Sequence, residues 1–216
     1  KIARDMGCQT IGAGMNEVEA SEPVYLEEAG GIGMFGVSYM AECIPATATE
    51  PGIFRWDDLD YIERRIQEVK SKCRWCIVVA HGGEEFTSLP SPYTRDRYLK
   101  FLELGADVVV GHHPHVPENY ELFDDGKAIF YSLGNFVFGG NGKPGDFDTA
   151  VIRQEILRHP DGTVTLGETV LLPTCVSSES RWNNFQPVLC EAGTDSYDRI
   201  LAKLSSTWKE ACIKIG

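Results

Sequence analysis

Four of the five histidines in the sequence lie at two places that each follow an apolar run. His81 comes directly after the run CIVVA, and His112, His113 and His115 come directly after the run VVVG. Functional residues of open α/β sheets gather where strands end and loops begin. Imidazole suits Zn, Fe, Mn or Ni at neutral pH, and Asp or Glu often completes such a site. The pattern therefore indicates a metal or catalytic site, and the alternative is that polar strand-end residues cluster without function.

The spacing within each group adds to this prediction. His113 and His115 lie two residues apart across Pro114, so both side chains can face a common centre if the backbone stays extended. Glu84 and Glu85 follow closely after His81 and offer a carboxylate ligand, or a group that orients a ligand. The fifth histidine lies in the turn sequence RHPDG and is expected to be solvated.

The elements that must position these groups alternate along the first two thirds of the chain. A short strand that runs into a turn is predicted in CQTIGAG, and a helical turn after an Asn cap is predicted in MNEVEAS. Two strands around a Gly-Gly turn are predicted in PVYLEEAGGIGMFGVSYM. Apolar residues recur on one face of a helix predicted over 57–72, and a second helix is predicted over 94–104. The strands CIVVA and DVVV are continuous apolar runs, which is typical of a sheet covered by helices on both sides. This order predicts an α/β fold.

After His115 the pattern changes to β structure. Hairpins are predicted around Asp124-Asp125-Gly126 and around Pro160-Asp161-Gly162, and a helix over about 197–214. No repeat or low-complexity linker marks an internal boundary. We therefore predict a single domain over 1–216, in which 151–216 form a β-hairpin and helical tail.

The composition excludes several classes of protein. The formal net charge of −12 and the absence of a dense Lys/Arg cluster argue against a nucleic-acid binder. The longest apolar run is far shorter than the roughly 20 residues that span a bilayer, and the first residues have no apolar core typical of a signal peptide. An acidic balance favours solubility and suits cations.

The seven cysteines do not form a recognisable framework. Their number is odd and their spacing does not repeat, unlike a set of paired disulfides. Cys73 and Cys76 have CxxC spacing, but a second pair for a zinc ribbon is missing, and the motif closes a helix instead of opening one. We interpret them as ordinary reduced cysteines.

Three motifs carry a resemblance to a known family. VVAHGGEEF, LELGADVVVGHHPHV and KAIFYSLGNFVF occur in this order, and together they resemble the bacterial poly-γ-glutamate capsule-synthesis (CapA-like) family, which is similar to the calcineurin-like metallophosphatases. The resemblance covers nearly all of residues 1–150. It implies an α/β fold, namely the C-terminal part of a metallophosphatase-like α/β/β/α sandwich with added β-hairpins.

The resemblance also implies roles for single residues. His81, His113 and His115 would be metal ligands, for a divalent Zn, Mn or Fe ion. Glu85 matches the glutamate of the family motif and would orient a ligand or a water molecule, and His112 would donate a proton to a leaving group. Asn135, in YSLGNF, would shape the rim of the site and contact substrate, although a turn-forming role is an equal alternative.

The sequence departs from the family pattern in two ways. The family motif HWGxEY reads HGGEEF here, so that Gly82 and Phe86 replace Trp and Tyr. The early Asp and the Asn-His pair of the superfamily are not found; Asn183-Asn184, for example, is followed by Phe185. We therefore expect that the chain lacks the N-terminal half of the family domain. We also expect that it holds at most one metal instead of a dinuclear centre, and that it has little or no hydrolytic activity by itself.

Three functions remain open at this point. The first is a metal-dependent hydrolase that acts on a phosphoester or on an amide of γ-linked polyglutamate, and the second is a non-catalytic component that binds or exports an anionic polymer during capsule assembly. The third is a binding domain whose histidines hold no metal. We expect no nucleic-acid partner, and we expect homodimerisation and membrane partners of capsule synthesis. The resemblance suggests a location outside the cytoplasmic membrane, whereas the cysteine content suggests a reducing or anaerobic setting.

Overall fold

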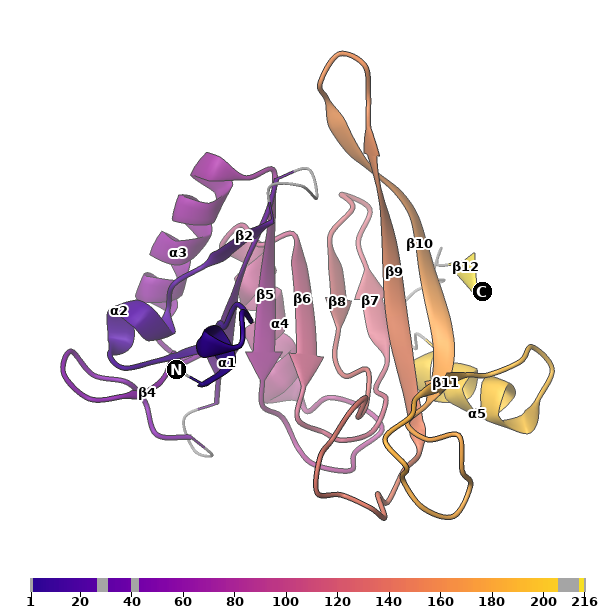
Figure 1. Ribbon diagram of the computed structural model, residues 1–216. Helices are drawn as coiled ribbons and strands as arrows, with labels where there is room; N and C mark the ends of the chain where they lie inside the picture. The colour runs from indigo at the N-terminus through magenta and orange to yellow at the C-terminus, as the bar shows by residue number, and fades with distance from the viewer. Residues whose placement is uncertain (1, 27–30, 40–42, 206–213, 216) are drawn as a thin grey trace. The chain divides into compact units, whose positions relative to one another are not determined.

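The computed structural model describes residues 2–26, 31–39, 43–205 and 214–215, and these form two compact units (Figure 1). The first unit comprises the described residues within 1–83, 92–111 and 124–129. The second comprises those within 84–91, 112–123 and 130–216. The prediction that 1–216 form a single domain stays a prediction.

The first unit contains a mixed sheet and its helices. Its strands are β2 (Val24–Leu26), β3 (Ile32–Ser38), β5 (Trp75–His81), β6 (Val108–His112) and β8 (Ala128–Phe130), in the order β2-β3-β5-β6-β8. β2 and β3 are antiparallel, whereas β3 and β5 are parallel. A small second sheet pairs β1 (Ala13–Gly14) with β4 (Gly52–Ile53). The helices are α1 (Ile2–Asp5), α2 (Glu17–Ala20), α3 (Leu59–Lys72) and α4 (Pro92–Glu103).

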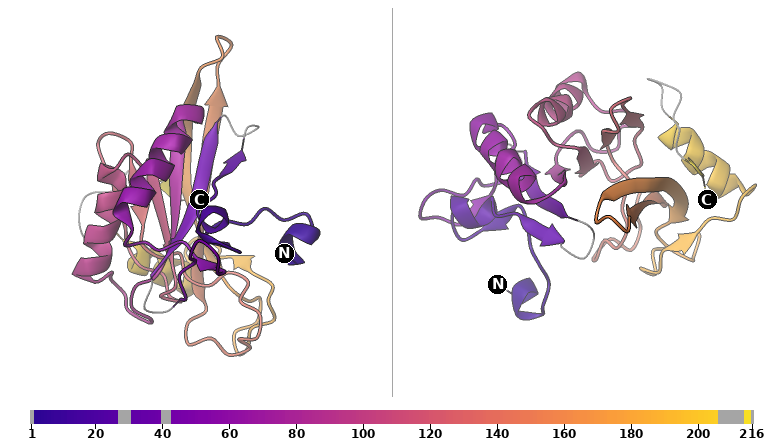
Figure 2. Two further views of the ribbon diagram at one scale, coloured as in Figure 1. Left: turned by 90° about the vertical axis from the view of Figure 1, so that its left-hand side faces the viewer. Right: turned by 90° about the horizontal axis from the view of Figure 1, so that it is seen from above.

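The two long helices of this unit cover the same face of its sheet (Figure 2). α3 begins after Asp58, whose side chain accepts a hydrogen bond from the backbone N–H of Tyr61 at 3.2 Å, and it buries Ile62, Ile66 and Val69. Burial along β5 and β6 alternates between complete and partial, although both strands are continuous apolar runs. The expectation that helices cover both faces is therefore wrong for α3 and α4. Helices on one face are what each sheet of an α/β/β/α sandwich has, so the α/β fold class is confirmed.

A buried tryptophan fills the space beside the glycine that follows β5. Trp56 is fully buried, and its ring centroid lies 5.0 Å from that of Tyr39 and 6.0 Å from that of Tyr98. A Cβ atom at Gly82 would lie only 2.9 Å from Cζ3 of Trp56 and 2.8 Å from Cβ of Tyr39. Trp56 thus occupies space that any side chain at position 82 would need, which gives a physical reason for a glycine there.

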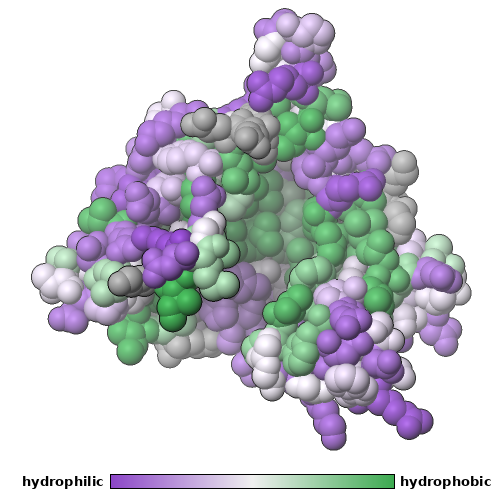
Figure 3. Space-filling model, in the orientation of Figure 1, coloured by the Kyte–Doolittle hydropathy of each residue, from purple (hydrophilic) through white to green (hydrophobic). Residues whose placement is uncertain are grey.

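The second unit is built on a long β-hairpin. β9 (Asp148–Arg158) and β10 (Val164–Cys175) are antiparallel, with an irregularity in register between Leu166 and Thr169. β11 (Val188–Leu189) pairs antiparallel with β10, and β12 (Lys214–Ile215) pairs parallel with it. β7 (Tyr120–Leu122) and α5 (Asp195–Leu204) complete the unit. The tip of the hairpin is hydrophilic on the face seen in Figure 3, as expected for a segment that projects into solvent.

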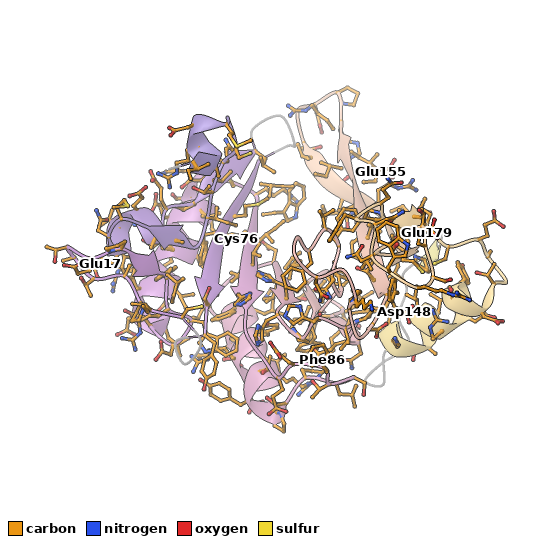
Figure 4. All side chains as sticks on the ribbon, turned by 60° about the horizontal axis from the view of Figure 1, so that its bottom comes forward. Glu17, Cys76, Phe86, Asp148, Glu155 and Glu179 are labelled. Atoms are coloured by element: carbon orange, nitrogen blue, oxygen red, sulfur yellow. The ribbon has the colours of Figure 1, made fainter. Side chains whose placement is uncertain are left out.

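α5 is fixed to the base of the hairpin by a buried carboxylate. Asp148, labelled in Figure 4, is only 1% exposed and accepts hydrogen bonds from the guanidinium of Arg199 at 2.6 and 2.8 Å. Lys203 donates to the same carboxylate at 2.6 Å. Burial by itself raises the pKa of Asp148, but these two cations outweigh it and hold the pKa below its usual range. The carboxylate is therefore ionised and paired on both sides.

Most elements predicted from the sequence are present, with shifted ends. The strand expected in CQTIGAG is reduced to Ala13–Gly14, because Gly12 has a φ of +81° and interrupts the extended backbone. The helix expected to begin near Tyr197 begins at Asp195, and its described part ends at Leu204; much of the rest of that prediction lies outside the described residues. Within the described residues, no helix combines the length and apolar character needed to cross a bilayer.

Candidate metal centre

Three side chains of the second unit form a candidate metal site. Glu85, His113 and His115 each offer a ligand atom, and all three atoms lie within 4.8 Å of one another. The Nε2 atom of His115 lies 3.7 Å from Oε1 of Glu85, and the two imidazole centroids are 5.8 Å apart. Two imidazoles and one carboxylate suit a divalent transition metal such as Zn, Mn or Fe. The two histidines are partly buried and the glutamate is exposed, so the site is open to solvent.

The backbone at this site is held in unusual conformations. His113 and His115 have φ angles of +114° and +64°, and Phe86, next to Glu85, has a φ of +59°. Non-glycine residues avoid this region, at a cost on the order of 1–3 kcal/mol each, and persist there only when surrounding contacts impose it. One such contact is the hydrogen bond from the backbone N–H of Phe86 to the carbonyl oxygen of Pro114, at 2.9 Å. It joins the segment that carries Glu85 to the segment that carries both histidines.

Asn135 determines which nitrogen of His115 can bind a metal. The side-chain Nδ2 of Asn135 donates to the carbonyl oxygen of His115 at 3.2 Å, so its Oδ1 is the atom that lies 2.8 Å from His115 Nδ1. Because Oδ1 can only accept, Nδ1 must carry the proton, and the lone pair is left on Nε2. That is the nitrogen near Glu85. A contact of this kind orients a metal ligand and fixes its tautomer.

Two phenylalanines hold the ring of His115 from its faces. The ring of Phe138 lies 5.1 Å from it at an interplanar angle of 12°, and the ring of Phe86 lies 5.9 Å from it at 28°. Phe86 is labelled in Figure 4. The sequence did not single out Phe138, although it belongs to the same motif as Asn135. The two phenylalanines thus contact the faces of the His115 ring, and Asn135 contacts its Nδ1 edge.

A buried carboxyl group supports the segment that carries Glu85. Glu118 is 2% exposed, and its Oε1 lies 3.1 Å from the hydroxyl of Thr87, which is 3.0 Å from the carbonyl oxygen of Glu84. Burial raises the pKa of Glu118 to about 7; the hydrogen bond with Thr87 lowers it and the charge of Glu84 raises it. The hydroxyl of Thr87 thus lies between two acceptors, Oε1 of Glu118 and the carbonyl oxygen of Glu84, and links the buried carboxyl group to the segment that carries Glu85. No pattern in the sequence pointed to Glu118.

The other predicted site residues stand as follows. His112 is the exposed last residue of β6 and is not a member of the triad. His81 is the last residue of β5 and belongs to the first unit. Their roles as proton donor and metal ligand, and the substrate contact of Asn135, stay predictions. His159 is exposed in the hairpin turn, where its Nε2 lies 2.8 Å from the hydroxyl of Thr165.

Comparison with known proteins identifies the family of the part of the chain that contains the triad. Residues 1–140, which include the triad and Asn135, match the family described as bacterial capsule synthesis protein PGA_cap. The chain is 30% identical over 155 residues to the PGA biosynthesis protein CapA of Bacillus subtilis (strain 168), which covers 70% of this chain and 40% of that protein. It is 32% identical over 145 residues to the capsule biosynthesis protein CapA of Bacillus anthracis, which covers 64% of this chain and 34% of that protein. The chain thus spans well under half the length of these relatives. It belongs to the bacterial capsule synthesis protein family PGA_cap.

Proposed function

We propose that Glu85, His113 and His115 hold one divalent cation, and that the protein acts in capsule synthesis as a metal-dependent hydrolase. The observation that carries this proposal is the orientation of His115, whose Nδ1 is engaged by Asn135 at 2.8 Å while its Nε2 lies near Glu85. A partner on Nδ1 that leaves the lone pair on Nε2 is the arrangement found at metal-binding histidines. The names of the two Bacillus relatives, which refer to PGA and capsule biosynthesis, support the biological role.

The donor set fits a catalytic site better than a structural one. Structural zinc sites are closed by four protein ligands, whereas catalytic sites keep a position open for water or substrate. Three ligands with the carboxylate half exposed agree with an open site. Zn, Mn or Fe would each accept these donors. The role of His81 as a metal ligand stays a prediction from the sequence.

A divalent cation in this position would supply Lewis-acid polarisation of a phosphoryl or carbonyl oxygen. The side chains of the protein would do the rest. Asn135 holds the proton of the neutral His115 ring on Nδ1, so that the lone pair available to the cation lies on Nε2. His112 is proposed to protonate the leaving group, since an imidazole can give up a proton near neutral pH. The proposed substrates are a phosphoester and an amide bond of γ-linked polyglutamate.

The metal site is tested first, on the 216-residue chain. Metal content by mass spectrometry and titration calorimetry with Zn²⁺ and Mn²⁺ are compared between the wild type and the double variant His113→Ala/His115→Ala. We expect near-stoichiometric metal in the wild type, loss of binding in the double variant, and unchanged binding in the control variant His159→Ala. Equal metal binding by the wild type and the double variant would overturn the proposed site.

The hydrolase assignment needs a separate assay. The metal-loaded chain is incubated with p-nitrophenyl phosphate and with a γ-linked glutamate peptide, again beside the double variant. We expect slow, metal-dependent turnover of one of them, because three ligands hold a single cation instead of the pair that clamps a phosphoryl group. Stoichiometric metal without turnover of either substrate would refute hydrolytic activity of this chain by itself, and the same assay on a full-length relative with an intact family domain would then test the hydrolase assignment. Absence of turnover in both would favour the polymer-binding alternative, in which the cation bridges an acidic protein to an anionic polymer.

A further inference from the structure

Two cysteines of the second unit lie in contact beside the short pairing of β10 and β11. The Sγ atoms of Cys175 and Cys190 are 3.5 Å apart, and both side chains are partly buried. Cys175 is the last residue of β10, and Cys190 directly follows β11. The antiparallel register continues past the paired residues, because the backbone N–H of Cys190 donates to the carbonyl oxygen of Pro173 at 2.9 Å. The ladder therefore holds the two thiols side by side.

We propose that Cys175 and Cys190 form an intramolecular disulfide under oxidising conditions, and that this bond steadies the segment that packs Phe138 on His115. The sulfur atoms must approach from 3.5 Å to about 2.0 Å, which side-chain rotation can supply when the backbones are already paired. The part that concerns His115 rests on the metal site proposed above. The disulfide itself does not.

The loop that the bond would close is tied to the metal site by hydrogen bonds. Asn183, in the middle of this loop and 2% exposed, donates from its backbone to the carbonyl oxygen of Gly142 at 2.8 Å and from Nδ2 to that of Asn141 at 3.1 Å. The backbone N–H of Asn141 lies 3.4 Å from the carbonyl oxygen of Phe138. The ring of Phe138 is stacked on His115 at 5.1 Å. Fixing both ends of the loop thus restrains a chain of contacts that ends at a metal ligand.

The oxidation balances with a small disulfide such as oxidised glutathione as the oxidant. One protein thiolate attacks a sulfur of glutathione disulfide, which forms a mixed disulfide and releases one reduced glutathione. The second protein thiolate attacks the protein sulfur of that mixed disulfide, closes the Cys175–Cys190 bond and releases the second glutathione. Two protein thiols lose two protons and two electrons, and the oxidant is reduced to two thiols.

The surroundings of Cys190 predict that this reaction is slow at neutral pH. Burial, followed by the contact with the Cys175 thiol, raises the pKa of Cys190 to about 12. Since the thiolate is the attacking species, closure should accelerate as the pH rises.

Peptide mapping tests the bond. The folded chain is equilibrated with oxidised glutathione, free thiols are alkylated, and the digest is examined by mass spectrometry. We expect the cross-linked peptide of Cys175 and Cys190 as the main disulfide, its loss in Cys175→Ser, and its retention in Cys8→Ser, which removes an exposed cysteine. If both cysteines are alkylated in full, or if Cys73–Cys76 is the main bond, the proposal is wrong.

Hydrogen exchange tests the effect on the site without any metal. Peptides that cover 136–145 should exchange more slowly in the oxidised than in the reduced protein, and Cys175→Ser should show no such difference. The loop of 15 residues also predicts a rise in Tm of about 5 to 10 °C on oxidation. Equal exchange in both redox states would overturn the coupling to Phe138. Because neither readout uses metal, failure of the proposed metal site would leave both results interpretable.

Discussion

Replacing Asn135 by Leu should weaken metal binding by about 30-fold without unfolding the protein. The leucine removes two hydrogen bonds to His115, the 2.8 Å contact with Nδ1 and the 3.2 Å contact with its carbonyl oxygen. Each of these hydrogen bonds contributes about 1 kcal/mol net. Together they hold the His115 ring in the orientation in which Nε2 lies toward Glu85. Losing them adds about 2 kcal/mol to the free energy of binding, or about 30-fold in Kd. This lies within the range of about 10- to 100-fold found when a group that orients a metal ligand is removed.

The assay is a competition between the protein and a chromophoric zinc chelator at pH 7.5, with circular dichroism and Tm as checks on folding. Asn135→Asp keeps an acceptor for Nδ1 and loses only the donor to the carbonyl oxygen, so its Kd should rise less than that of Asn135→Leu. Gln67→Leu, at an exposed position of α3, serves as the control and should bind like the wild type. A Kd for Asn135→Leu within about twofold of the wild type would refute the argument from the tautomer.

Two further predictions concern stability. Gly82→Ala should destabilise the protein by about 1–3 kcal/mol, because its Cβ would lie 2.9 Å from the buried ring of Trp56; urea denaturation measures this. Glu118→Gln should stabilise the protein at pH 8 by about 3 kcal/mol but much less at pH 5, because burial raises the pKa of Glu118 from 4.5 to about 7. As the pH rises through this interval, the unfolded chain loses the proton that the folded protein keeps, so the carboxyl group costs stability until both states are ionised.

Each of these predictions has a matched control. Gly139→Ala introduces a Cβ with nothing within 4 Å and should leave the unfolding free energy unchanged. Glu103→Gln changes an exposed carboxylate of α4 and should have the same small effect at pH 5 and pH 8. If Gly82→Ala lowers the free energy of unfolding no more than Gly139→Ala does, the packing argument is contradicted. An effect of Glu118→Gln that does not change with pH would contradict the raised pKa.

The sequence located the residues of the candidate metal site better than the groups that contact them. His113 and His115, predicted as ligands, and Glu85, predicted to orient a ligand or a water molecule, could be found because strand ends and residue types are local features of the chain. Glu118 and Phe138 could not, since their roles depend on contacts with Thr87 and His115, which lie 31 and 23 positions away along the chain. The left-handed backbone at both histidines was also missed: the spacing across Pro114 suggested an extended segment, whereas the folded structure gives positive φ angles.

The same distinction holds for the fold. α3 and β5 were predicted well because a clear helical period and a continuous apolar run need no tertiary information. The strand near Gly12 was overestimated, because a glycine with positive φ cannot be recognised without its turn. The pairing of β11 with β10 was not predicted at all, since a strand of two residues carries no period. The pairing of β11 with β10 also brings Cys190 close to Cys175.

The ion pairs of Asp148 with α5 set a limit on how far the chain can be shortened. A version that ends before Arg199 would keep β9 and β10, the two long strands of the hairpin, in full. It would nevertheless leave at the base of β9 a carboxylate that is 1% exposed and has lost both of its cations. An uncompensated buried charge costs on the order of 3–5 kcal/mol, a large share of the stability of an ordinary domain. Expression of this region for crystallisation should therefore extend at least through Lys203, or carry Asp148→Asn if it stops earlier.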